Sequence, residues 1–141
     1  VKQSLAITES VNQKGDIQPI GGVNEKIKGY FEICSIRGLT GEQGVVIPMQ
    51  NVQDLMLSED IIEKVKQGMF HIYPVSTIEQ AAERMLGLPA GEMNPDFSYP
   101  DGTLFGLVDK CLEKLHAVSS EDEKEHHGAK HTPKRKAKSN E

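Results

Sequence analysis

The stretch IQPIGGVNEKIKGYFEICSIRG, Ile17–Gly38, decides the fold, because it contains the end of a strand and the whole of a helix. Gly21 and Gly22 interrupt the strand. After them, apolar residues recur every three or four positions, which predicts a helix over Val23–Arg37. Gly38 supplies a C-terminal cap for this helix.

The two lysines of this helix are predicted to lie on different sides of it. With Val23 at zero and about 100° per residue, Lys26 lies at about 300°. That direction falls between Ile33 at about 280° and Tyr30 at about 340°. Lys28 lies at about 140°, on the polar side. We therefore expect Lys26, and not Lys28, inside the apolar sector of the helix.

A lysine in an apolar setting has two interpretations. Loss of hydration disfavours the charged form and lowers the pKa of such an amine, which is how a lysine becomes a general base near neutral pH. Alternatively, a lysine at the edge of an apolar stripe extends its ammonium to water. Helical geometry alone leaves both interpretations open for Lys26.

Strands are predicted on both sides of this helix. Before it, Ser4–Val11 and Asp16–Ile20 form a β-hairpin around a turn at Gln13–Gly15, and Pro19 limits the second strand. After it, the sequence predicts a buried strand, Gly44–Pro48, and then one or two helices within Met49–Gly68, with a helix start at Ser58. A second strand, Met69–Val75, follows. The last helix begins with a capping box of Ser76 and Glu79 and ends near Leu86. The first crossover implies a parallel strand pair, and hence an α/β fold with some α+β character.

The remainder of the chain is predicted to be less compact. We expect the compact domain to span residues 1–92, followed by a linker and an added helix over residues 93–118. Apolar residues at helical spacing predict that helix over Thr103–Val118, with its apolar side packed on the domain or on a neighbouring chain. The charged tail, residues 119–141, has nothing to bury and is expected to be disordered.

Composition excludes several classes of protein. The chain has 141 residues and a net charge of −5, which is typical of a soluble domain and not of a dedicated nucleic-acid binder. No apolar run is long enough to span a membrane, and the N-terminal residues lack a signal-peptide pattern. Cys34 and Cys111 are far apart and form no CxxC motif. We therefore expect a reduced, cytoplasmic protein.

Several of these segments resemble the proteolytic domain of the Lon family of ATP-dependent proteases. The segment PIGGVNEK, Pro19–Lys26, is similar to the family's catalytic-lysine segment, and LAIT, Leu5–Thr8, to the strand whose threonine lies beside that lysine. GVVIP, HIYPV and STIEQAAERMLG resemble later strands and the last helix of the domain. The resemblance covers roughly residues 4–90 and is nearest to a bacterial Lon-related branch with long C-terminal ends. It implies a Lon proteolytic-domain fold, with Lys26 as the catalytic base and Thr8 as its supporting hydrogen-bond partner.

The resemblance also implies an activity and its partners. Lon enzymes are Ser–Lys endopeptidases in which a serine attacks the peptide carbonyl and the lysine accepts its proton. We expect the intact protein to degrade unfolded or damaged proteins in a ring-shaped homo-oligomer. No serine of this chain lies in the Ser-Ala segment typical of the family, and no phosphate-binding GxxxxGK[ST] motif is present. The nucleophile and the ATPase, with its ATP and Mg²⁺, are therefore expected outside this chain, which should be inactive by itself.

Other residues allow alternative interpretations. Glu9 replaces the small residue usual after the family's threonine. A carboxylate close to Lys26 would raise the pKa of that lysine and oppose its action as a base, whereas strand alternation favours an orientation of Glu9 toward the other face. His71 is interpreted as a packed structural residue, and His126, His127 and His131 as weak metal binders at most, so no metal site is predicted. The basic run His131–Lys138 could contact nucleic acid, but the acidic residues just before it offset its charge, so a solvated tail is expected instead. The missing serine leaves a non-catalytic scaffold or interaction module of similar fold as the alternative function.

Overall fold

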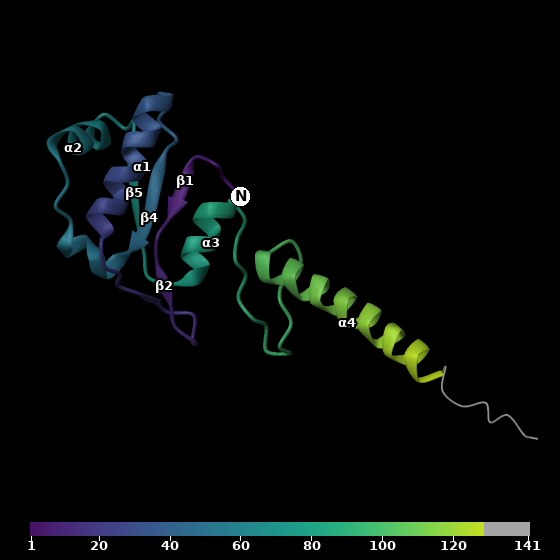
Figure 1. Ribbon diagram of the computed structural model, residues 1–141. Coiled ribbons are helices and arrows are strands. Elements are labelled where there is room, and N and C mark those ends of the chain that lie inside the picture. The colour runs from purple at the N-terminus through teal and green to yellow at the C-terminus, as the bar shows by residue number, and fades with distance from the viewer. Residues whose placement is uncertain (129–141) are drawn as a thin grey trace, which may run out of the picture. The chain divides into compact units, whose positions relative to one another are not determined.

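The chain forms two compact units in the computed structural model, which describes the backbone of residues 1–128 and the side chains of residues 1–118. The first unit is Val1–Glu92 and the second is Met93–Glu141. Figure 1 shows the first unit as a small sheet with helices on both sides. No helix in the described part of the chain is both long and apolar enough to cross a membrane.

The central sheet has three parallel strands, β1 (Leu5–Ile7), β4 (Gly44–Pro48) and β5 (His71–Val75), in the order β1-β4-β5. In register, Ala6 lies beside Val45, and Val45 beside Ile72. The predicted parallel pair, β4 and β5, is therefore confirmed. Helix α1 (Val23–Arg37) lies between β1 and β4 in the chain, so β1 and β4 are also joined through a helical connection.

Two apolar clusters separate the layers of the first unit. On one face of the sheet, α1 and α2 (Glu59–Lys66) pack with the β4 side chains of Val45 and Ile47 around the fully buried Phe70. On the other face, Val46 and Val75 pack with α3 (Ile78–Leu86) and with Ile17 of β3 (Ile17–Gln18). The alternation of β4 side chains between the two clusters follows from the pleat of a strand. The predicted α/β fold is thus confirmed, with α1 and α2 on one side of the strands and α3 on the other (Figure 1).

The helix α1 has the predicted bounds because both of its ends are set locally. Gly22 and Gly38 flank it with φ of 70° and 89°, and only glycine adopts positive φ without strain. The hydroxyl of Tyr30 donates a hydrogen bond to the Ser4 carbonyl oxygen at 2.9 Å, which ties the helix to the segment before β1. Burial of this phenol raises its pKa to about 12.

The prediction of one continuous strand over Ser4–Val11 is wrong. Its first part, β1, joins the central sheet, whereas β2 (Ser10–Val11) pairs antiparallel with β3 in a separate hairpin. The Asn12 side chain closes this hairpin by accepting hydrogen bonds from the backbone of Lys14 and Asp16. Alternating apolar residues indicate that a segment is extended, but they do not indicate which strand it pairs with. The pairing of β1 with the parallel strand β4 is what separates β1 from β2.

The elements after β4 follow the prediction with shifted starts. The segment that follows forms a 3₁₀ helix, η1 (Met49–Asp54), and α2, which begins after Ser58 as predicted. The strand β5 begins two residues later than expected. The cap of α3 is Thr77 and not Ser76, because the Thr77 hydroxyl accepts a hydrogen bond from the Gln80 backbone. The Gln80 side chain in turn accepts a hydrogen bond from the Ser76 backbone, so the capping motif lies one residue further along.

The second unit is dominated by one long helix, α4 (Leu104–Gly128). Tyr99 packs on Phe105 in the first turn of this helix, with ring centroids 5.4 Å apart, and Asp101 forms an ion pair with Lys110 in its second turn at 2.7 Å. The expectation that helix gives way to disorder after residue 118 is wrong for residues 119–128, where the helix continues. These residues contain no proline, and glycine only at the end, so nothing local stops the helix. Residues 129–141 lie outside the described part.

Candidate active site

The junction between β3 and α1 fixes where the first turn of the helix begins. Gly22 has φ 70° and ψ 28°, and its carbonyl oxygen accepts the first helical hydrogen bond from the backbone N–H of Lys26 at 3.1 Å. A side chain at Gly22 would strain this left-handed conformation. Gly21, by contrast, has open space where a Cβ would be. Only the second glycine is therefore required by the backbone.

A buried asparagine holds the residue just before the two glycines. The Asn51 side chain is only 3% exposed and makes two hydrogen bonds to the backbone of Ile20. Its Oδ1 accepts from the Ile20 N–H at 2.9 Å, and its Nδ2 donates to the Ile20 carbonyl oxygen at 3.0 Å. The Nδ2 also donates to the Asp54 carboxylate at 3.2 Å. One amide thus satisfies both polar groups of a residue 31 positions away in the chain.

A second asparagine holds the first turn of α1 from the same side. The Asn24 Nδ2 donates to the Asp54 carbonyl oxygen at 2.9 Å, and its Oδ1 accepts from the Met56 backbone N–H at 2.8 Å. Together, Asn51 and Asn24 connect η1 and the segment after it to both sides of the Gly-Gly turn. Sequence reasoning missed both residues, because an isolated asparagine carries no periodic signal and its partners are distant in the chain.

Lys26 follows directly on this turn, but its predicted burial is wrong. The side chain is exposed, as is that of Lys28. The buried face of α1 is a narrow stripe of Val23, Ile27, Phe31 and Cys34. The flank toward Lys26 stays open, because Ile33 at its edge is 52% exposed. Among the described residues, Lys28 pairs with Glu32 at 3.9 Å, and Lys26 has neither a hydrogen bond nor an ion pair through its ammonium.

Thr8 is the residue that follows β1. Its backbone N–H donates to the Val46 carbonyl oxygen at 3.1 Å, which continues the β1–β4 ladder by one residue, and its side chain is half-buried. Ala6, two positions earlier, packs with the cluster on the α1 side of the sheet. Strand alternation therefore directs Thr8 toward the same face as α1. No hydrogen bond links the Thr8 and Lys26 side chains within the described residues.

Glu9 is half-buried, and one of its carboxylate oxygens is shielded from solvent without a hydrogen-bond partner among the described residues. Burial raises the pKa of this carboxyl group above its usual range. Among the described residues it forms no ion pair with Lys26 within 4.0 Å. Glu9 therefore does not neutralise the amine in this arrangement.

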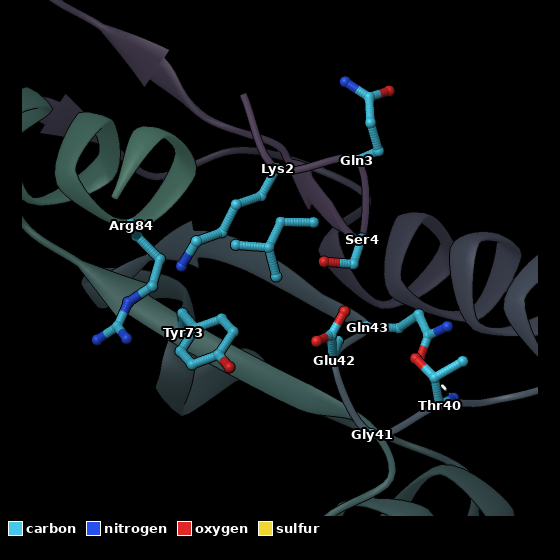
Figure 2. A pocket seen from close by; sticks show the side chains of 10 residues that line it. Lys2, Gln3, Ser4, Thr40, Gly41, Glu42, Gln43, Tyr73 and Arg84 are labelled. Atoms are coloured by element: carbon cyan, nitrogen blue, oxygen red, sulfur yellow. Dashed lines mark hydrogen bonds between the residues drawn. The ribbon is translucent and has the colours of Figure 1, made fainter. Parts of the chain in front are cut away.

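A hollow in the described structure lies elsewhere, beside the start of β1. It has a volume of about 770 Å³ and lies over Tyr73, whose ring contacts the Arg84 guanidinium at 4.6 Å. Figure 2 shows Lys2 and Arg84 on the Tyr73 side of this hollow and Glu42 on the other. The charges are mixed, and neither Lys26 nor Thr8 lines it.

His71 has the packed, structural environment that was predicted for it. Its Nε2 donates to the Gly41 carbonyl oxygen at 2.8 Å, and its ring stacks on Tyr73 with centroids 5.7 Å apart. These contacts fix the start of β5 against the loop before β4. Of the three tail histidines, His131 lies outside the described residues, and the side chains of His126 and His127 are not described.

The fold is an α/β domain in which a Gly-Gly turn leads into the helix that carries Lys26. Residues 1–87 match the family of the Lon protease (S16) C-terminal proteolytic domain, so the chain belongs to this family. The resemblance found in the sequence is thereby confirmed at the level of the family.

Named relatives agree with this assignment. A putative Lon protease homolog of Haemophilus influenzae is 46% identical over 111 residues, covering 79% of this chain and 18% of that protein. A putative Lon protease homolog of Escherichia coli is 49% identical over 88 residues, covering 62% of this chain and 15% of that protein. The archaeal Lon protease of Thermococcus kodakarensis is 37% identical over 83 residues, covering 59% of this chain and 11% of that protein. The chain thus spans less than a fifth of the length of these relatives.

Proposed function

We propose that this chain carries the general-base half of a Ser–Lys endopeptidase site, in which Lys26 is the base and Thr8 orients it. Membership of the Lon proteolytic family over residues 1–87 is the observation that carries the proposal. The rigid attachment of the Gly-Gly turn through Asn51 supports it, because a base must be held within a fraction of an ångström of its working position.

The mechanism assigns each proton. The hydroxyl of a serine outside these 141 residues loses its proton to the neutral Lys26 Nζ while its oxygen attacks the peptide carbonyl. The protonated amine then donates to the leaving nitrogen, which leaves an acyl-enzyme. Water hydrolyses this ester, and Lys26 again accepts the proton. The Thr8 hydroxyl accepts a hydrogen bond from the amine and thereby directs the nitrogen lone pair toward the serine.

A lysine works as a base only when it is shielded from water, since bulk water stabilises its charged form. The open flank of α1 beside Lys26 and Ile33 leaves room for such shielding. We infer that the serine-bearing segment of the intact protein packs on this flank. It would then bring the nucleophile to the amine and exclude water from it in the same step.

At the level of the whole protein, we propose an ATP-dependent protease that degrades unfolded or damaged proteins in the cytoplasm as a ring-shaped homo-oligomer. ATP and Mg²⁺ would bind a domain outside this chain. The names of the relatives, which are Lon proteases or their putative homologs, support this proposal.

The proposal is tested by substituting Lys26 in the intact protein and measuring cleavage of an unfolded protein substrate and of a short fluorogenic peptide. Lys26→Arg keeps the charge and length of the side chain, but a guanidinium cannot act as a base. We expect it to lower peptide cleavage by about 1,000-fold or more, with ATP hydrolysis and circular dichroism unchanged. The matched control is Lys28→Ala, an equally exposed lysine two residues away, which should retain activity. Cleavage within tenfold of wild type in Lys26→Arg would remove Lys26 from the mechanism.

A second experiment locates the nucleophile. We expect a fluorophosphonate to label the intact protein at a serine outside residues 1–141, and labelling to be lost in Lys26→Arg. Labelling of a serine within this chain would contradict the proposed division of the site. Labelling nowhere, together with no peptide cleavage, would favour a non-catalytic scaffold. For Thr8, Thr8→Val should lower cleavage roughly 10- to 100-fold, whereas Thr8→Ser, which keeps the hydroxyl, should retain most of it.

A further inference from the structure

The long helix α4 exposes a continuous apolar stripe that the proposed protease site does not use. Five of its large apolar side chains are between 44% and 67% exposed: Leu107, Val108, Leu112, Leu115 and Val118. Cys111, which lies among them, is a free and exposed thiol. Within the second unit, the three later members of the stripe, Leu112, Leu115 and Val118, are the most exposed. Contiguous apolar surface of this kind marks an interaction site.

The spacing along the stripe is that of a helix–helix seam. Val108, Cys111, Leu115 and Val118 are separated by three, four and three residues, which are the a and d positions of two successive heptads. Leu104 continues the pattern four residues before Val108. Leu107 and Leu112 occupy the flanking g and e positions and widen the stripe.

Charged residues of the same segment are segregated from the seam. Asp109, Lys110 and Glu113 fall at the outer b, c and f positions. Lys114, at a g position, is the one charge that borders the stripe between residues 104 and 118. The stripe is therefore nearly uncharged and complementary to itself, with no charge pattern that would select a charged partner.

We propose that this stripe is a self-association surface, on which the α4 helices of two copies of this chain pack together. Complete burial of the five exposed side chains would remove about 500 Å² per copy, so the pair buries at most about 1,000 Å² through them, which is at the lower limit for a specific interface. The isolated chain therefore forms a dimer that dissociates on dilution. The 111-residue match to the Haemophilus influenzae relative is longer than the first unit, so the similarity extends into the unit that contains α4.

The test is sedimentation velocity of the 141-residue chain from about 1 µM to several hundred micromolar, under reducing conditions. We expect the wild type to shift from monomer toward dimer as the concentration rises. The double variant Leu112→Glu and Leu115→Glu places charge on the seam and should remain monomeric throughout. The matched control, Glu113→Gln, lies on the opposite face of the same turn and should associate like the wild type. Circular dichroism confirms that each variant is folded.

The free thiol provides an independent readout. A flexible bis-maleimide should link two copies through Cys111, because the other cysteine, Cys34, is buried in α1. The linked dimer should be absent in Cys111→Ser and reduced at least tenfold in the double glutamate variant.

Three outcomes would overturn the proposal. The wild type could be monomeric at every concentration. The double glutamate variant could associate as well as the wild type, which would place the interface elsewhere. Finally, the chain could stay monomeric while the double variant lowers the melting temperature of its first unit, and Val1–Glu92 would then be the partner of the stripe. The test does not depend on proteolytic activity, so its failure and that of the proposed function are distinguishable.

Discussion

The hydrogen bonds of Asn51 to Ile20 allow a quantitative prediction about the lysine turn. Replacing Asn51 with alanine removes three hydrogen bonds and leaves the N–H and carbonyl groups of Ile20 without their partners in a half-buried site. Each unsatisfied group costs about 1–3 kcal/mol, less where water enters the space that is left. We expect the free energy of unfolding to fall by about 2–4 kcal/mol, a large part of the 5–15 kcal/mol typical of a domain.

A near-isosteric substitution separates hydrogen bonding from packing. Asn51→Asp keeps an acceptor for the Ile20 N–H but turns a carboxylate oxygen toward the Ile20 carbonyl and the Asp54 carboxylate. It should destabilise at least as much as Asn51→Ala at neutral pH. Protonating the introduced carboxyl restores a donor, so this extra loss should diminish as the pH falls below about 5.

The assay is urea denaturation of the 141-residue chain, followed by circular dichroism. The control is Gln53→Ala, an exposed position on the same 3₁₀ helix, which should stay within about 0.5 kcal/mol of wild type. Hydrogen exchange adds a local readout, since the Ile20 amide should lose protection in Asn51→Ala but not in Gln53→Ala. If Asn51→Ala unfolds within about 0.5 kcal/mol of wild type, the contacts of Asn51 do not hold the turn.

Three further predictions concern single positions. Gly22→Ala should lower the free energy of unfolding by about 1–2 kcal/mol, because φ is 70° there, whereas Gly21→Ala, with open space around it, should be nearly neutral in thermal melts. Gly44→Ala should cost about 1–3 kcal/mol in urea titrations, since a Cβ would lie 2.8 Å from the Tyr73 ring. The pKa of Glu9 is raised by burial, so its ionisation opposes folding at neutral pH and this penalty disappears as the pH falls below the raised value. Glu9→Gln should therefore stabilise the chain at pH 7 by roughly half a kcal/mol, the partial exposure of the residue limiting the gain, and should flatten the dependence of stability on pH between 4 and 7.

The sequence by itself determined the elements whose limits are local. The bounds of α1 follow from Gly22 and Gly38, both of which adopt positive φ, and the strand Gly44–Pro48 follows from a short apolar run between turns. The motif that ends in Lys26 likewise predicted the family. Each of these signals lies within a few residues of the feature it predicts.

Only the tertiary structure decided that β1 pairs with β4 and not with the hairpin, which side chains are covered, and what holds the turn. The break between β1 and β2 depends on β4, more than 30 residues away, and the contacts of Asn51 with Ile20 join segments that share no local pattern. A helical wheel identifies which residues of α1 lie on the same side of the helix. The exposure of each residue depends on what packs against that side. In the described residues nothing covers the flank of Lys26, and for that reason the periodicity of the helix could not predict its exposure.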